Sequence, residues 1–146
     1  MTMTSRPTTP GGSASPGQPA TVEYRLVRNG VVRDVQKGRR NREDVCDAHP
    51  ELLRAARNVG RRTGEDCPIC DATRTVEVTY VFGARLPPGG TCPATRTELN
   101  RLRRRSEPVL CYEVEVCPQC AWHHLLRKYP AGGGLPSVPS RARERV

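Results

Sequence analysis

Two stretches of the chain alternate between apolar and polar residues, which is the pattern of a half-buried β-strand. The first is TVEVTYVF at 75–82 and the second is PVLCYEVEV at 108–116. Alternation at every second residue places one set of side chains on each face of a strand. In the second stretch one face has Leu110, Tyr112, Val114 and Val116, and the other has Cys111, Glu113 and Glu115. The two strands, separated by a connection at 83–107, predict an antiparallel hairpin.

Residues 21–36 admit two predictions. Their apolar residues fall at helical spacing: Tyr24, Val27, Val31 and Val35. Asn29-Gly30 between apolar runs is instead typical of a tight hairpin turn. Because the alternation that a hairpin needs is poor after Gly30, we favour a helix with a weak Asn-Gly step.

Two further helices are predicted from their boundaries. Pro50 suits the first position of a helix and Gly60 suits its end, which predicts a helix at 50–59. Its apolar face consists of Leu52, Leu53, Ala56 and Val59. Thr95 and Glu98 have the spacing of a capping box, which predicts a short basic helix that begins after Thr95.

The stretch after Cys120 shows helical spacing as well. Its apolar residues fall at i, i+3, i+4 and i+7: Trp122, Leu125, Leu126 and Tyr129. A helix that buries this face places four polar residues on its outer face: His123, His124, Arg127 and Lys128. We therefore predict an amphipathic helix that begins directly after the cysteine.

The two ends of the chain differ in composition from its centre. Residues 1–20 consist almost entirely of Thr, Ser, Pro, Gly and Ala, and residues 131–146 are similar with added arginines. Segments of this kind cannot bury enough apolar surface to offset their ordering entropy. We predict disordered tails there and one compact domain at 21–130, with a helical part at 21–62 and a metal-binding part at 63–130.

The net charge of +9 rests on arginine, because only Lys37 and Lys128 among the 24 basic residues are lysine. The tails carry three of the nine net positive charges. The charge that remains on the body of the chain is a modest indication of an anionic partner. The N-terminus lacks the pattern of a signal peptide, and no apolar stretch approaches the length of a membrane span. We expect a soluble, cytoplasmic protein.

Two matched cysteine pairs carry the strongest chemical signal. Cys67-Pro-Ile-Cys70 and Cys117-Pro-Gln-Cys120, here called the first and second knuckle, each bring two thiolates together across a tight turn. A hairpin that joins them supplies four sulfur ligands, the closed shell of a structural zinc site. We predict one structural Zn²⁺ bound by these four cysteines. Rubredoxin-like iron is an alternative that uses the same ligands.

The other three cysteines have weaker assignments. Cys46 and His49 have ligand-like spacing, which would suit a second site or an alternative ligand. The simpler interpretation is that His49 caps the helix that follows and that Cys46 fills a small apolar space. Cys92 and Cys111 receive no role.

These elements predict an α+β fold, with a small helical N-terminal half before the zinc-binding hairpin. The order of knuckle, hairpin and helix is that of a treble-clef finger. A zinc ribbon, with a third strand in place of the helix, is the alternative. Zinc ribbons usually have glycine after each knuckle, where this chain has Asp71 and Ala121. Since alanine favours a helix, we predict the treble-clef arrangement.

Four blocks stand out in order: CDAHPELLRAA from Cys46, CPIC from Cys67, YVFG from Tyr80 and CAWHHL from Cys120. Together they resemble a family of small actinobacterial proteins with a domain of unknown function, over residues 21–130. The resemblance implies a helix at 21–36, from which Asn29-Gly30 departs, and it implies no established activity. The four knuckle cysteines match the family pattern, whereas Cys92 and Cys111 do not.

The sequence shows no catalytic constellation, such as an activated nucleophile, a phosphate-binding loop or a pair of acids in a motif. We therefore expect a non-enzymatic zinc protein that docks on nucleic acid or on a nucleoprotein machine of transcription or translation. The candidate contacts to such a partner are Arg101, Arg103, Arg104, Arg105, His123, Arg127 and Lys128. A protein–protein adaptor with a purely structural zinc is the alternative, and a thiol or zinc redox sensor is a third hypothesis. No membrane or small-molecule partner is expected.

Overall fold

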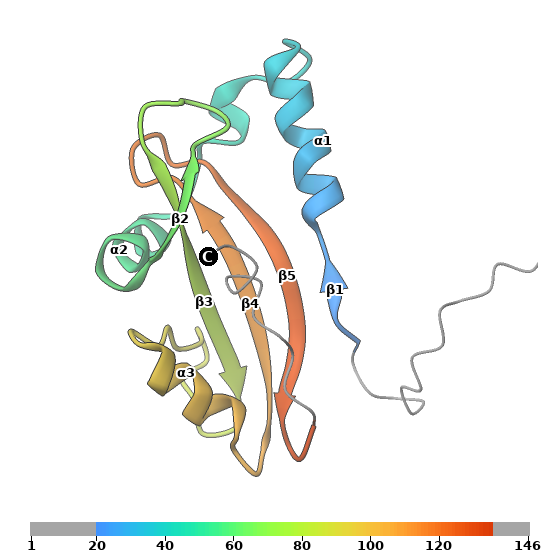
Figure 1. Cartoon of the computed structure of the whole chain (residues 1–146), viewed down its shortest axis with the longest axis vertical. Coiled ribbons are helices and arrows are strands. Elements are labelled where there is room, and N and C mark those ends of the chain that lie inside the picture. The colour runs from blue at the N-terminus through green and yellow to red at the C-terminus, as the bar shows by residue number, and fades with distance from the viewer. Residues whose placement is uncertain (1–19, 136–146) are drawn as a thin grey trace, which may run out of the picture.

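The computed structural model describes residues 20–135 and arranges them as one five-stranded antiparallel sheet with helices beside it (Figure 1). The sheet order is β1-β5-β4-β3-β2. The strands are β1 (Val22–Glu23), β2 (Arg61–Asp66), β3 (Arg74–Gly83), β4 (Pro108–Val116) and β5 (His123–Gly132). The helices are α1 (Arg25–Gln36), the 3-10 turn η1 (Arg42–Asp44), α2 (Pro50–Val59) and α3 (Arg96–Arg103). The predicted α+β class is confirmed.

The predicted ends of the domain are only partly described. Residues 1–19 and 136–146, which hold most of the two predicted tails, lie outside the described residues. At the C-terminal side β5 continues to Gly132, past the predicted domain end at residue 130. Ala131 is 4% exposed, so the sheet extends into the segment that composition alone assigned to a tail.

The hairpin and the three predicted helices before residue 108 are present. β3 pairs with β4 from Val76 opposite Val116 to Gly83 opposite Val109. α3 has the predicted cap, since the amide of Glu98 donates to the Thr95 hydroxyl at 3.1 Å. None of the helices within residues 20–135 is long and apolar enough to cross a bilayer.

The helices cover the two faces of the sheet unequally. α2 packs on the face that presents Val78 and Val116, and α3 packs on the opposite face, against Cys111. α2 covers only part of the sheet face on which it packs. Leu110 and Tyr112, farther along β4 on that face, remain half-buried. The apolar face of the hairpin is therefore the less completely covered one.

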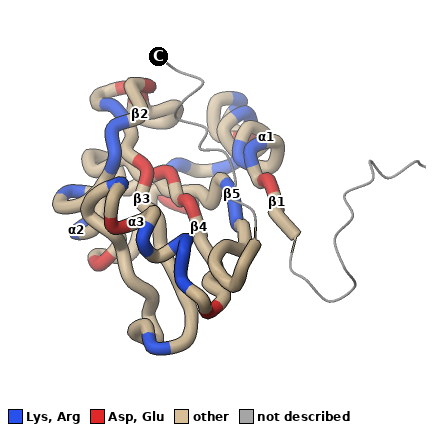
Figure 2. The backbone as a smooth tube through the Cα atoms, turned by 60° about the horizontal axis from the view of Figure 1, so that its bottom comes forward, with Lys and Arg blue, Asp and Glu red and all other residues tan. Residues whose placement is uncertain are grey.

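The opposite face, which holds the acidic residues of β4, is buried more deeply. Glu113 and Glu115 are 7% and 3% exposed. Arg127 donates to Glu113 at 2.6 Å, and Arg28 of α1 donates to both carboxylate oxygens of Glu115 at 2.8 and 2.9 Å. Acidic positions of β3 and β4 lie next to one another in the middle of the sheet (Figure 2). Pairing with arginine from other elements lets these carboxylates lie in the interior.

The helix predicted after Cys120 is wrong, because His123–Gly132 form β5. This strand pairs with β4 on one side and with β1 on the other. A β-bulge explains the misleading spacing. The register shifts between Glu113 and Val114 of β4, where β5 contributes one extra residue, Leu126. The extra residue interrupts the two-residue period and leaves apolar residues three and four positions apart, which imitates a helical face.

Ala121 does not continue into a helix either. Its φ is 69°, and that of Asp71, the residue after the first knuckle, is 54°. Both residues adopt the left-handed conformation that favours glycine. A third strand follows the second knuckle, so the feature that favoured the treble-clef arrangement is absent. The order of elements is the one that the ribbon alternative predicts.

Candidate metal centre

The two knuckles meet at one end of the sheet. Cys67 and Cys70 belong to the turn between β2 and β3, and Cys117 and Cys120 belong to the turn between β4 and β5. Because β3 pairs with β4, the two turns lie side by side. The four Sγ atoms all lie within 4.8 Å of one another. Within residues 20–135, this is the group of His, Cys, Asp and Glu side chains that is placed to hold a metal ion.

The sulfur spacing suits a tetrahedral ion. Cys67 Sγ lies 3.8 Å from Cys120 Sγ, and Cys70 Sγ lies 3.7 Å from Cys117 Sγ. Four sulfur atoms at about 2.3 Å from a central zinc stand about 3.8 Å apart at the corners of a tetrahedron. The residues present therefore fit zinc, with thiolates as its ligands.

The backbone of each knuckle is directed at its first sulfur. The amide of Cys70 donates toward Cys67 Sγ at 3.5 Å, and the amide of Cys120 donates toward Cys117 Sγ at 3.4 Å. The amide of Ala121 then closes the second turn by donating to the Cys117 carbonyl at 3.0 Å. Amides that face the sulfur stabilise the thiolate form, which is the form that binds metal.

Burial controls the ionisation of the thiols in the metal-free chain. It raises the pKa of Cys67 and Cys117 to about 11 and that of Cys120 to about 12. Burial also acts to raise the pKa of Cys70, but hydrogen bonds from the Ala72 backbone and from neighbouring thiols outweigh it and lower this pKa to about 7. A bound cation stabilises all four thiolates, so metal binding displaces protons.

An apolar cluster connects the centre to the helical part of the chain. Trp122 is completely buried and packs with Cys67 and Cys117. Val32 of α1 and Val45, which follows η1, belong to the same cluster. α1 and the segment after η1 are therefore packed against the metal centre, whereas α2 packs on the sheet.

The segment before α2 also reaches the centre. His49 caps α2 as predicted, because the amide of Glu51 donates to His49 Nδ1 at 3.2 Å. Cys46 packs against the apolar cluster, and its Sγ lies 3.6 Å from that of Cys120. The Cys-x-x-His spacing drew attention to this segment in the sequence, but nothing local indicated which knuckle it would meet.

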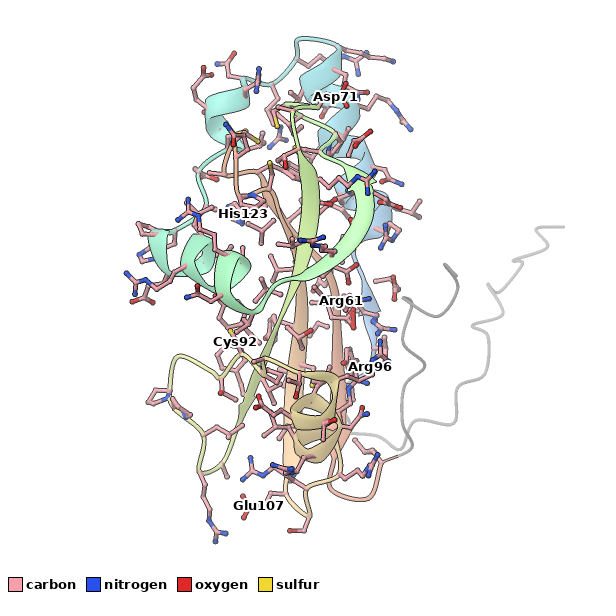
Figure 3. All side chains as sticks on the ribbon, turned by 60° about the vertical axis from the view of Figure 1, so that its left-hand side comes forward. Arg61, Asp71, Cys92, Arg96, Glu107 and His123 are labelled. Atoms are coloured by element: carbon pink, nitrogen blue, oxygen red, sulfur yellow. The ribbon has the colours of Figure 1, made fainter. Side chains whose placement is uncertain are left out.

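The remaining two cysteines take no part in the centre. Cys111 is fully buried in the cluster beneath α3. Cys92 packs at the edge of the α2 cluster. Figure 3 shows it well down the sheet from Asp71, which follows the first knuckle.

Three of the predicted anion contacts are engaged with other groups of the protein. Arg127 is 4% exposed, so its prediction as an outer-face residue is wrong. It lies on β5, opposite Glu113, on the sheet face that α1 and α3 cover. The guanidinium carbon of Arg103 lies 5.2 Å from the Tyr129 ring centroid, and this arginine also donates to the Tyr129 hydroxyl. Arg105 donates to the Ala84 carbonyl at 2.8 Å.

The other predicted contacts face outward but do not gather in one place. Arg101 and Arg104 are exposed on α3 and its C-terminal cap. Lys128 lies on the opposite face of the sheet, with its ammonium 6.0 Å from the centroid of the Tyr112 ring. His123 pairs at 3.0 Å with an aspartate of the segment before α2. The structure therefore brings the four cysteines together and separates the proposed basic contacts.

Comparison with known proteins places the sequence in a family. Residues 16–145 match the profile of DUF5318, a family of unknown function. The chain belongs to this family. It is 37% identical over 120 residues to uncharacterized protein Rv0049 of Mycobacterium tuberculosis (strain ATCC 25618 / H37Rv) and to uncharacterized protein Mb0050 of Mycobacterium bovis. These 120 residues are 82% of this chain and 88% of each relative. No solved structure matches the chain. The resemblance seen in the sequence blocks is confirmed.

Proposed function

We propose that this protein is a non-enzymatic module held together by one structural Zn²⁺ ion. The ligands are the four knuckle cysteines: Cys67, Cys70, Cys117 and Cys120. The observation that carries the proposal is the spacing of their sulfur atoms, which is that of a tetrahedral shell. Four protein thiolates leave no open coordination position, and this separates structural zinc from catalytic zinc. We class the centre as zinc-ribbon-like, because strands flank both knuckles: β2 and β3 the first, β4 and β5 the second.

The apolar cluster around the centre supports a structural role for the ion. Five buried residues form it, and two of them, Cys67 and Cys117, are themselves ligands. Structural zinc contributes about 10–16 kcal/mol in finger peptides at pH 7. That is as large as the whole net stability of a typical domain, about 5–15 kcal/mol. The ion is therefore expected to decide whether this end of the sheet folds.

We further propose that the folded module docks on nucleic acid or on a nucleoprotein complex. The net charge of +9 and the exposed Arg101 and Arg104 of the α3 region support this candidate. Arginine presents a planar fork of donors that suits phosphate oxygens. Arg103, Arg105 and Arg127 are engaged with other groups of the protein, which leaves the exposed α3 surface as the main contact.

The apolar face of the sheet favours a second candidate, an adaptor that binds another protein. Tyr80, Phe82, Leu110 and Tyr112 line a hollow of about 460 Å³ beside α2, and none of these four is fully buried. Aromatic rings in a shallow apolar hollow are typical of surfaces that bind proteins. In this candidate the zinc is equally structural and the charge serves solubility.

Metal analysis of the purified chain tests the zinc centre. We expect about one zinc per chain. Cys67→Ser and Cys117→Ser should each lose the ion and the folded state. Cys92→Ser changes a cysteine away from the centre and should keep both. Purified wild-type chain that contains iron, or no metal at all, would contradict the proposal.

Binding to mixed RNA and DNA across a salt series separates the two docking candidates. Nucleic-acid binding should weaken steeply as salt rises. The double variant Arg101→Gln/Arg104→Gln should bind more weakly than the matched α2 control Arg54→Gln/Arg57→Gln. Absence of binding at low salt rejects this candidate. The adaptor candidate is then tested by capture of a protein partner from nuclease-treated lysate. Wild-type chain should retain this partner, and Leu110→Glu should lose it.

A further inference from the structure

Cys46 places a fifth thiol against the metal centre. Its Sγ donates toward Cys120 Sγ at 3.6 Å, which is no longer than the spacing between paired ligand sulfurs. The neighbouring backbone is tied to the second knuckle, since the Ala48 amide donates to the Ala121 carbonyl at 3.0 Å. Asp47 pairs with the first residue of β5 at 3.0 Å. These contacts hold Cys46 beside one particular ligand.

Solvent reaches both Cys46 and Cys120. Cys67 and Cys117 are 1% and 0% exposed, whereas Cys46, Cys70 and Cys120 are partly exposed. The sulfur next to that of Cys70 belongs to Cys117, the buried ligand of the second knuckle. Only the Cys46–Cys120 pair among these close pairs joins two partly exposed thiols and includes a thiol outside the tetrahedral shell. Exposed thiols with a second thiol at hand are the ones that oxidants convert to disulfides.

We propose that Cys46 and Cys120 form an oxidation site, at which a hydroperoxide joins the two sulfur atoms as a disulfide and opens the metal shell. The consequence, release of zinc, rests on the proposed function. The disulfide itself requires only the two thiols. The module is then structural in reduced surroundings and gives up its ion when peroxide is present.

The reaction balances with the hydroperoxide as the only added reagent. The Cys120 thiolate attacks one oxygen of hydrogen peroxide, the O–O bond breaks, and hydroxide leaves while Cys120 becomes a sulfenic acid. The Cys46 sulfur then attacks the sulfenic sulfur of Cys120, so the S–S bond forms and the S–O bond breaks. The proton of the Cys46 thiol leaves with this second hydroxide as water. Two electrons pass from the sulfur pair to the peroxide.

The geometry permits this step with a small movement. The two sulfur atoms must approach from 3.6 Å to the roughly 2.05 Å of a disulfide bond. Cys46 lies between η1 and α2, outside both elements, so its side chain can turn without breaking a helix or sheet. Once Cys120 is oxidised, the ion keeps three thiolates and gains an open position, and a chelator can compete for it.

The experiment uses the zinc-loaded full chain and hydrogen peroxide in small molar excess. Zinc is followed with a chromophoric chelator, and disulfides are located by peptide mapping without reduction. Wild-type chain should release zinc and yield a peptide that links Cys46 to Cys120. Cys46→Ser keeps all four ligands and should release zinc roughly tenfold more slowly. Cys92→Ser, the matched control at another partly exposed cysteine, should behave as wild type.

Two results would overturn the inference. One is zinc release from Cys46→Ser at the wild-type rate. The other is a map in which disulfides join only ligand cysteines while Cys46 stays reduced. If Cys46→Ser does not fold, the rate of zinc release is measured on Cys46→Ala instead. The disulfide map of the wild-type chain tests the inference independently of either variant. An untreated chain without zinc contradicts the proposed function alone, because mapping of the metal-free chain still shows whether the Cys46–Cys120 link forms.

Discussion

Ala121 has a backbone conformation that usually belongs to glycine. With φ at 69°, it turns the chain back after the second knuckle. Its amide donates to the Cys117 carbonyl, and its own carbonyl accepts from the Ala48 amide. A residue with a Cβ atom loses about 1–2 kcal/mol in the left-handed region. The surrounding hydrogen bonds and the metal shell hold the residue there in spite of this cost.

Ala121→Gly should raise the free energy of unfolding by about 0.5–1 kcal/mol. The substitution removes the steric cost, and the added freedom of the unfolded chain offsets part of the gain. Denaturant unfolding in excess zinc measures the difference. Ala55→Gly, inside α2, is the matched control and should lose about 1 kcal/mol. Equal losses for the two variants would show that Ala121 is not strained.

Arg127 should stabilise the fold through its buried carboxylate partner. Arg127→Met removes the guanidinium that donates to Glu113 at 2.6 Å, and the cost should be about 3–5 kcal/mol because a buried charge loses its partner. Adding Glu113→Gln to this variant should recover part of the loss, since it removes the unpaired charge. Thermal and denaturant unfolding measure both. A loss below about 1 kcal/mol would mean that the pair behaves like a surface pair.

At the scale of the element, α1 shows how packing overrides a weak local signal. Asn29-Gly30 suits a turn, yet the helix continues through both residues to Gln36. Val32 is buried against the metal centre, and Arg28 bonds to Glu115 of β4 on the sheet. These two anchors lie on either side of the Asn-Gly step and hold the helix across it.

Gly30→Ala should stabilise the protein by about 0.5–1 kcal/mol. The residue is helical, and a Cβ built there meets no atom within 4 Å, so alanine lowers the entropy of the unfolded chain at no steric cost. Gly38→Ala is the contrasting control. Gly38 has a φ of +76°, and alanine there should lose about 1 kcal/mol. The two midpoints of denaturant unfolding should move in opposite directions.

At the scale of the whole molecule, β4 links the three apolar clusters. Cys111 belongs to the cluster under α3, Val116 to the cluster under α2, and Cys117 to the cluster around the metal centre. The strand, which is paired with β3 and β5 along its length, and the residue directly after it thus join all three clusters. The clusters are therefore expected to unfold together.

Removal of zinc should unfold the domain as a whole rather than its metal-binding end alone. The expected contribution of the ion, about 10–16 kcal/mol, exceeds what the remaining contacts of a small domain usually supply. Circular dichroism and the fluorescence of Trp122, the only tryptophan of the chain, report the change after chelation. Zinc should restore both signals, and magnesium should not. A cooperative thermal transition that survives chelation with little shift would contradict this expectation.

The sequence alone determined the features that depend on neighbouring residues. Pro50 and Gly60 delimit α2, and Thr95 with Glu98 marks the start of α3. Apolar alternation located β3 and β4, and the paired spacing of the cysteines indicated the four thiols that meet. Each of these signals is contained in a few consecutive residues, because capping, strand alternation and chelation by a tight turn are local effects.

Only the tertiary structure decided the features that depend on distant partners. A bulge hides the alternation of β5, and its nature as a strand comes from the hydrogen bonds that β4 and β1 offer it. Glu115 is buried because Arg28, 87 positions away, pairs with it, and Cys46 meets a ligand sulfur 74 positions away. A short amphipathic segment forms a helix or a strand according to which of the two its neighbours in the fold stabilise. Those neighbours cannot be identified from the segment itself.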